Sequence, residues 1–172
     1  MRIAEDHDEV AYPLGPALEF LQRLWQLDHA LERLSSTMEK RLGVTAQQRL
    51  ILRCVGKYPG VTPGALARIL HVDAGTVSAA LRILAQRKFI DRHRDPRDGR
   101  RVLLGLTARG RKLDRPTRGT VEAAVEQLLA TTPAKELHAG LRMVERLTAL
   151  VHLEAAEGPR TKASPRPRSP RS

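Results

Sequence analysis

Apolar residues recur at helical spacing near both ends of this chain. From about residue 17 to 42 they follow steps of four and three, forming a heptad-like seam of Phe20, Leu24, Leu27, Leu31, Leu34 and Met38. This seam is suited to packing on the helix's own domain or on a second subunit, and the periodicity alone favours neither. A C-terminal helix is predicted with Thr132 as N-cap and Pro133 in its first turn. Its apolar stripe consists of Leu137, Leu141, Val144, Leu147 and Val151.

The middle of the chain predicts two short helices in succession. Thr62 is a hydroxyl N-cap and Pro63 fits the first helical position, while Asp73 can cap the second helix. In the second helix Val77, Ala80, Leu81 and Leu84 share one face, which we expect to be buried. The opposite face is small, polar or cationic and carries Gly75, Ala79 and Arg82, with Thr76 and Ser78 toward its edges. A second helix with a slim polar face is typical of a helix-turn-helix that reads the major groove.

Another helix is expected just before this pair, through about Val55. Gly43 ends the first helix, and Thr45 and Gln48 form a capping box for the next. Its predicted apolar side consists of Leu50, Ile51 and Cys54. We interpret Cys54, the single cysteine, as a buried and unreactive thiol rather than an oxidant sensor.

A hairpin signal follows the two short helices. Two extended segments, 89–94 and 102–107, flank a turn of Pro, Asp and Gly at residues 95–101. Seven basic and three acidic residues lie between Arg87 and Arg101, a net charge of +4. A basic hairpin directly after a helix-turn-helix is a wing. Thr107 then caps a further helix.

Pro116 and Gly119 interrupt the helix after the wing, because an interior proline costs about 3 kcal/mol. Either the helix kinks at residues 115–116, or it stops and restarts with Thr120 as a new cap. We favour the kink.

Composition limits the class of partner. The chain has 172 residues, a formal charge of +11 and a pI near 10.9, which indicate a polyanionic partner. Only five aromatic residues are present, too few for the stacking platforms of single-strand and RNA binders, so duplex DNA is favoured. The N-terminal residues lack a signal-peptide pattern and no stretch is long enough to span a membrane, so we expect a cytoplasmic protein.

The segments "VTPGALARIL" and especially "DPRDGRRVLLGLTARG" resemble the winged-helix domain of the MarR (multiple antibiotic resistance regulator) family. The resemblance extends from about Leu18 to Leu153. It implies a mostly α-helical fold with a small β-wing, in which N- and C-terminal helices form a homodimer. We therefore expect a flexible acidic lead-in at 1–15, a MarR-like domain at 16–157 and a disordered basic tail at 158–172. Within that domain the winged helix spans about 45–107 and the dimerisation helices about 17–42 and 108–156.

The resemblance also implies a function: a homodimeric repressor that binds a pseudo-palindromic operator on double-stranded DNA and is relieved by a small aromatic or phenolic ligand. The expected DNA-binding residues are Thr62, Thr76, Ser78, Ala79, Arg82, Arg94, Arg97, Arg100 and Arg101. We expect Arg100 to reach the minor groove and Asp98 to shape the wing by pairing with an arginine. Many relatives have arginine in place of Ala79 and glycine in place of Lys88; a left-handed Lys88 would be mildly strained.

Three further residues are candidates for the ligand site by helix order: Trp25, His29 and Arg53. The alternative for Trp25 is simple packing beside the dimer seam. No phosphate loop, nucleophile or metal-binding constellation is recognisable, so we expect neither an enzyme nor a metal or other cofactor. Two alternatives stay open: a basic architectural protein that binds DNA without sequence preference, and a tail that either grips phosphate or only aids solubility.

Overall fold

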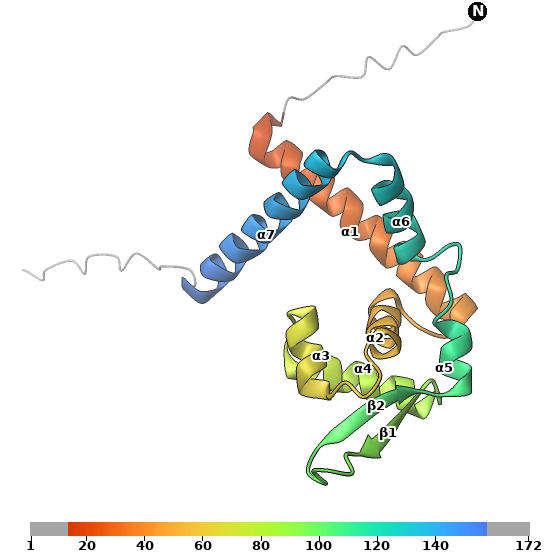
Figure 1. Ribbon diagram of the computed structural model, residues 1–172. Coiled ribbons are helices and arrows are strands. Elements are labelled where there is room, and N and C mark those ends of the chain that lie inside the picture. The colour runs from red at the N-terminus through yellow and green to blue at the C-terminus, as the bar shows by residue number, and fades with distance from the viewer. Residues whose placement is uncertain (1–13, 158–172) are drawn as a thin grey trace, which may run out of the picture. The chain divides into compact units, whose positions relative to one another are not determined.

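A computed structural model of the chain describes residues 14–157. The elements in order are α1 (Gly15–Leu42), α2 (Ala46–Lys57), α3 (Pro63–Leu70), α4 (Ala74–Gln86), β1 (Ile90–Arg94), β2 (Val102–Leu106), α5 (Ala108–Leu113), α6 (Val121–Thr131) and α7 (Ala134–Glu157). The predicted fold class, mostly α with a small β-wing, is confirmed (Figure 1). The chain forms two compact units that divide after Val125. The expected tail and residues 1–13 of the expected lead-in lie outside the described residues, and α1 already begins at Gly15.

Each of the four caps predicted for the winged-helix domain is confirmed. Thr45 forms a complete capping box with Gln48, and the Thr62 hydroxyl accepts the amide of Ala65 at 3.2 Å. The carboxylate of Asp73 and the hydroxyl of Thr107 each accept an amide three residues later, at 2.8 and 3.0 Å. Side-chain caps satisfy donors that a helix leaves free at its N-terminus. The helix starts are therefore determined locally, by residues that can be read directly from the sequence.

Left-handed residues end α1 and α3 and the turn after α4. Gly43 ends α1 with φ at 76°, as expected, and Lys88 has φ of 57° at the end of the turn after α4. His71, which closes α3, also has a positive φ of 52°, and the sequence did not predict this. A left-handed non-glycine residue is mildly strained, and here the conformation is held by the turn around it.

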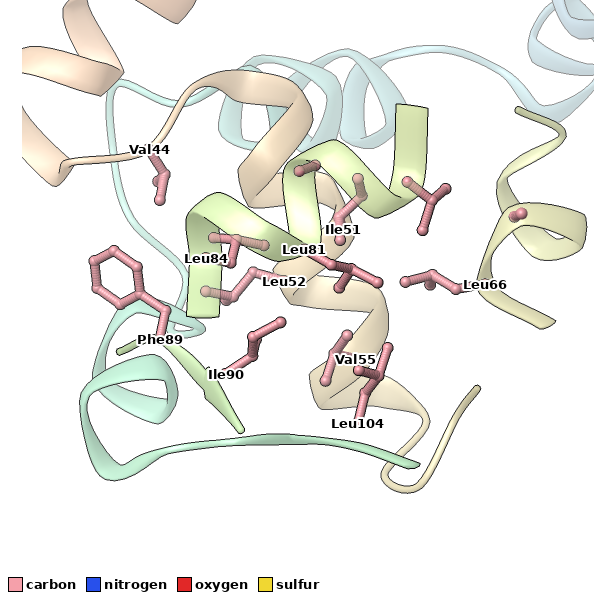
Figure 2. Close-up of a cluster of buried hydrophobic side chains, with 13 residues drawn as sticks. Val44, Ile51, Leu52, Val55, Leu66, Leu81, Leu84, Phe89, Ile90 and Leu104 are labelled. Carbon is pink, nitrogen blue, oxygen red and sulfur yellow. The ribbon is translucent and has the colours of Figure 1, made fainter. Parts of the chain in front are cut away.

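Helices α2, α3 and α4 and the hairpin enclose the hydrophobic core (Figure 2). The predicted inner face of α4 is buried at all four positions. The predicted apolar side of α2 was partly wrong, because Leu50 is 48% exposed, whereas Ile51, Leu52 and Val55 are buried. These three residues occupy one helical stripe, and Cys54 lies at its half-buried margin.

The wing is an antiparallel pair with Ile90 opposite Leu106 and Arg94 opposite Val102. Its base is joined to the link between α2 and α3: the amide of Gly60 donates to the carbonyl of Leu104 at 2.9 Å, and the amide of Leu104 donates to the carbonyl of Val61 at 3.0 Å. Since Leu104 is also buried, the base of the hairpin is part of the core while its turn projects beyond the helices (Figure 1).

The favoured kink at residues 115–116 was wrong. Helix α5 stops at Leu113 and α6 begins at Val121, so the alternative of a stop and restart is correct. Thr120 caps the new helix by accepting the amide of Ala123 at 3.2 Å, and Gly119 turns the chain with φ of 70°. A kink would have kept the helical path, whereas the left-handed Gly119 redirects it.

The seam of α1 divides into two parts. Met38, near the winged-helix domain, is fully buried, whereas Leu27 is 56% exposed and Phe20 and Leu31 are also exposed. Helix α7 carries a comparable exposed stripe that includes Leu141, Val144 and Val151. It starts at Ala134 with the Pro133 carbonyl accepting the amide of Leu137, and within the described residues the Thr132 side chain makes no capping hydrogen bond, contrary to expectation. Within residues 14–157, no helix has the length and apolar character needed to cross a bilayer.

Candidate nucleic-acid interface

A depression of about 410 Å³ lies on the outer face of α4. Three of the predicted contact residues, Ser78, Ala79 and Arg82, line it. Arg92 from β1 lines it too, although the sequence analysis did not single this arginine out. The available signal was its place in the first strand of the basic hairpin, a few residues after α4. The lining is completed by Pro63, Gly75 and Leu81. Small residues on the helix therefore form a floor between two arginines.

Thr76, one of the predicted DNA-contact residues, holds the N-terminus of α4 in the structure. Its amide and its hydroxyl both donate to the carboxylate of Asp73. A phosphate group only accepts hydrogen bonds, so the Thr76 hydroxyl would have to leave Asp73 before it could donate to DNA. Thr62 is likewise occupied as the N-cap of α3. We therefore place both threonines as residues that fix the two helices of the helix-turn-helix.

The two aspartates of the wing shape its turn. Asp95 accepts the amide of Arg97 at 2.9 Å, and Asp98 accepts the amide of Arg100 at 3.1 Å. The expected pairing of Asp98 with an arginine side chain was wrong; Asp95 instead lies 3.8 Å from the Arg101 guanidinium. A carboxylate that accepts an amide two residues later forms an Asx turn, which fixes the backbone of the donor residue. The turn presents Arg97 and Arg100 to solvent.

Positive charge without an ion-pair partner is present on α4 and the wing. Five exposed arginines of this surface have no ion-pair partner within residues 14–157: Arg82, Arg92, Arg94, Arg97 and Arg100. Unpaired guanidinium groups on a rigid scaffold suit phosphate and guanine, both of which accept paired hydrogen bonds. Here the chemistry fits a duplex whose major groove receives α4 and whose backbone meets the wing.

The cap of α4 should be sensitive to acid. The hydrogen bond from the Thr76 side chain, followed by that from its amide, lowers the pKa of Asp73 below its ordinary 3.8. A lowered folded-state pKa means that the stabilisation is present above the unfolded pKa and is lost as the pH falls through the folded one. We expect Asp73→Ala to destabilise the protein at neutral pH, and the difference from wild type to shrink below about pH 4. Chemical unfolding of both proteins from neutral pH to below about pH 4 measures their difference in unfolding free energy. A difference that does not change with pH would contradict the role of Asp73 as a cap.

The three candidate ligand residues are not brought together. Trp25 and His29 line one depression on α1, of about 590 Å³, with Trp25 68% exposed. Arg53 lines a different depression, where its guanidinium lies 3.1 Å from the Asp114 carboxylate. Within the described residues of one chain, the structure therefore does not bring Arg53 into the depression of Trp25 and His29. The sequence placed Arg53 on the correct helix but did not reveal its partner, which is 61 residues away.

Two other groups of side chains have potentially reactive or metal-binding atoms. Cys54 is half-buried, and burial raises the pKa of its thiol, which supports the interpretation of an unreactive cysteine. Asp28, His29 and Glu32 bring possible metal-ligand atoms within 4.8 Å of one another on α1. All three are exposed, and exposed acidic groups of this kind are common without a metal.

The fold and this surface define a winged helix-turn-helix DNA-binding protein. Residues 42–101 match the model of the MarR family. The transcriptional repressor Rv2887 of Mycobacterium tuberculosis is 32% identical over 106 residues, which cover 62% of this chain and 76% of the repressor. The chain belongs to the MarR family, and it is a DNA-binding transcription regulator.

Solved structures are similar in fold. The S. aureus MepR–DNA complex has a TM-score of 0.63 at 24% identity and covers 77% of this chain and 97% of MepR. The PcaV regulator of Streptomyces coelicolor, solved with its natural ligand, has a TM-score of 0.61 at 25% identity, covering 81% of this chain and 96% of PcaV. The relatives found are regulators rather than enzymes.

Proposed function

We propose that the protein is a homodimeric repressor that binds a pseudo-palindromic operator and is released from it by a small molecule. The observation that carries the proposal is the depression on α4, where Arg82 and Arg92 flank Ser78 and Ala79 without an ion-pair partner within the described residues. The similar repressor Rv2887 supports the direction of regulation. Each subunit would place α4 in the major groove of one half-site, about 10 bp from the other.

Within this depression the two arginines should have separable roles. Arg82 is on the recognition helix, so we expect it to contact base edges, whereas Arg92 on the wing strand should contact phosphate. Arg82→Ala should relax the sequence preference at one position per half-site by about 1–3 kcal/mol. Arg92→Ala should weaken binding to all sequences nearly equally and reduce the salt slope by about one.

Binding to a set of single-base operator variants at several salt concentrations distinguishes the two arginines. If Arg82→Ala lost the same affinity for every operator variant, Arg82 would have no role in reading the bases. A salt slope unchanged in Arg92→Ala would remove that arginine from the phosphate contacts.

Exposed apolar surface on α1 and α7 supports the homodimer. Phe20, Leu27 and Leu31 of the predicted seam are exposed, and so are Leu141 and Val144 on α7. An exposed apolar stripe on a helix usually marks an interface. We infer that a second copy of the chain covers it, as the heptad-like spacing on α1 predicts. Sedimentation equilibrium measures the state directly, and a monomer at micromolar concentration would contradict the proposal.

For the ligand we propose a small aromatic or phenolic acid at Trp25 and His29. Their shared depression combines the exposed indole of Trp25 with the imidazole of His29 and the guanidinium of Arg33, and Asp28 also lines it. Aromatic stacking and a cation suit such an acid. Titration of Trp25 fluorescence with candidate acids, in parallel with operator binding, tests this site. No fluorescence change and no loss of DNA affinity would dismiss the acids tried.

A further inference from the structure

The segment between α5 and α6, residues 114–120, has carbonyl groups that no regular helix satisfies. Pro116 also removes an amide donor, and Gly119 has a left-handed backbone. Backbone carbonyls packed against protein need donors, because leaving them unpaired costs free energy comparable to a lost hydrogen bond. Here the donors are largely arginine side chains from α1 and α2.

Three arginines hold this segment. Arg41, in the last turn of α1, donates from one nitrogen to the carbonyls of Arg118 and Gly119, at 2.6 and 2.9 Å. Arg53 donates to both the backbone carbonyl and the carboxylate of Asp114. The third arginine, Arg49, reaches the centre of the break.

Arg49 is the most constrained of the three, because only 1% of it is exposed. Its two terminal nitrogens donate to the carbonyls of Leu113 and Arg115, at 2.6 and 2.9 Å. Its Nε lies 2.9 Å from the carboxylate of Glu122 in the first turn of α6. This last contact is an ion pair rather than an aligned hydrogen bond, since neither Glu122 oxygen has a well-oriented donor within the described residues. One buried side chain thus joins the end of α5, the break and the start of α6.

Close packing fixes the same segment from two other sides. A Cβ added to Gly56 would lie 2.4 Å from the Asp114 carboxylate, so α2 approaches this residue without a side chain between them. A Cβ at Gly119 would lie 2.7 Å from the Arg41 guanidinium. Thr120, itself buried, donates to the carbonyl of Thr117 at 2.8 Å. The segment therefore has a defined path, although it contains neither helix nor strand.

We infer that Arg49 is a positioning residue that fixes the direction in which α6 leaves the winged-helix domain, and thereby sets the half-site spacing that the dimer accepts. The inference rests on the proposed function. The chain reaches its second compact unit only through this segment and α6. A segment without regular secondary structure transmits a fixed direction only where side chains hold it, and Arg49 contacts both of its ends.

The test compares the affinity of wild type and variants for inverted repeats whose half-site spacing changes by one base pair at a time. Arg49→Met removes the charge and every donor but keeps a long apolar stem, and Arg49→Lys restores the charge alone. Arg111→Met is the matched control, because Arg111 also donates to a backbone carbonyl, that of Leu106 at 2.7 Å, but outside the break. A spacing readout responds to positioning, whereas a merely structural role would change only stability.

We expect the wild-type protein and Arg111→Met to bind most tightly at the same single half-site spacing. In Arg49→Met the preference for that spacing over its neighbours should fall by roughly three- to tenfold, with Arg49→Lys between the two. If Arg49→Met does not fold, the double variant Arg41→Gln/Arg53→Gln, which loosens the same segment from its exposed sides, should broaden the optimum in the same way.

A folded Arg49→Met, or failing that the folded double variant, that keeps the wild-type spacing profile would overturn the inference alone. A wild-type protein that binds every spacing equally would overturn the proposed function and this inference with it. A sharp spacing preference in the wild-type protein therefore distinguishes failure of this inference from failure of the proposed function.

Discussion

Arg100→Ala is expected to lower operator affinity by about 1–3 kcal/mol, or roughly fivefold to 150-fold, without loss of the fold. The Arg100 side chain is exposed and has no ion-pair partner within the described residues. The backbone amide of Arg100 donates to the Asp98 carboxylate at 3.1 Å, which fixes the turn that carries this side chain. A pre-positioned guanidinium loses little conformational entropy when it enters a minor groove. Fluorescence anisotropy with a labelled operator measures the loss, and circular dichroism checks the fold.

The neighbouring residue provides the matched control. Arg101 has the same charge and a similar exposure, but its guanidinium lies 3.8 Å from the Asp95 carboxylate. We expect Arg101→Ala to have a smaller effect, confined to the salt-dependent part of the affinity. Equal losses for the two variants would mean that the wing contributes only its net charge, and would remove the special role of Arg100.

The second large effect is on stability. Gly110→Ala should destabilise the protein by at least about 3 kcal/mol, at the upper end of the usual cost of overpacking. Gly110 is buried in α5, and a Cβ there would lie 2.0 Å from the backbone carbonyl oxygen of Phe89. Backbone cannot rotate away as a flexible side chain can. The glycine therefore lets α5 cross the base of the wing, beside the Thr107 hydroxyl that also donates to Phe89.

Gly64→Ala is the control for this substitution. Gly64 lies in α3, is exposed, and nothing within 4 Å would meet an added Cβ. Alanine at such a helical position should stabilise the protein by about 0.5–1 kcal/mol. Urea unfolding of both variants gives the two free energies. If Gly110→Ala proves as stable as wild type, the close crossing of α5 over Phe89 is wrong.

Features that depend on neighbouring residues could be predicted from the sequence. The caps at Thr45, Thr62, Asp73 and Thr107 each involve partners three residues away, and the inner face of α4 follows from helical spacing. The same spacing predicts Ala79 and Arg82 on the outer face of α4 and Ser78 toward its edge. These three do line the depression at the proposed interface.

Features that depend on distant partners could not be predicted. Arg49 has an ordinary cationic side chain in the sequence, and its burial follows only from carbonyls that lie 64 and 66 residues later. A helix that stops before Pro116 leaves backbone carbonyls without intrahelical donors. Arginine side chains donate to these carbonyls, which favours the break over a kink. Arg92 was missed because its role depends on how closely β1 approaches α4.

Binding selection from genomic DNA fragments, with the 172-residue chain at physiological salt and a sequencing readout, tests the central claim most directly. We expect enrichment of an inverted repeat with half-sites about 10 bp apart. Diffuse enrichment with no shared sequence would contradict it. The net charge of +11 would then indicate an architectural protein that coats DNA, and the roles given to Ser78, Arg82 and Arg100 in readout would have to be withdrawn.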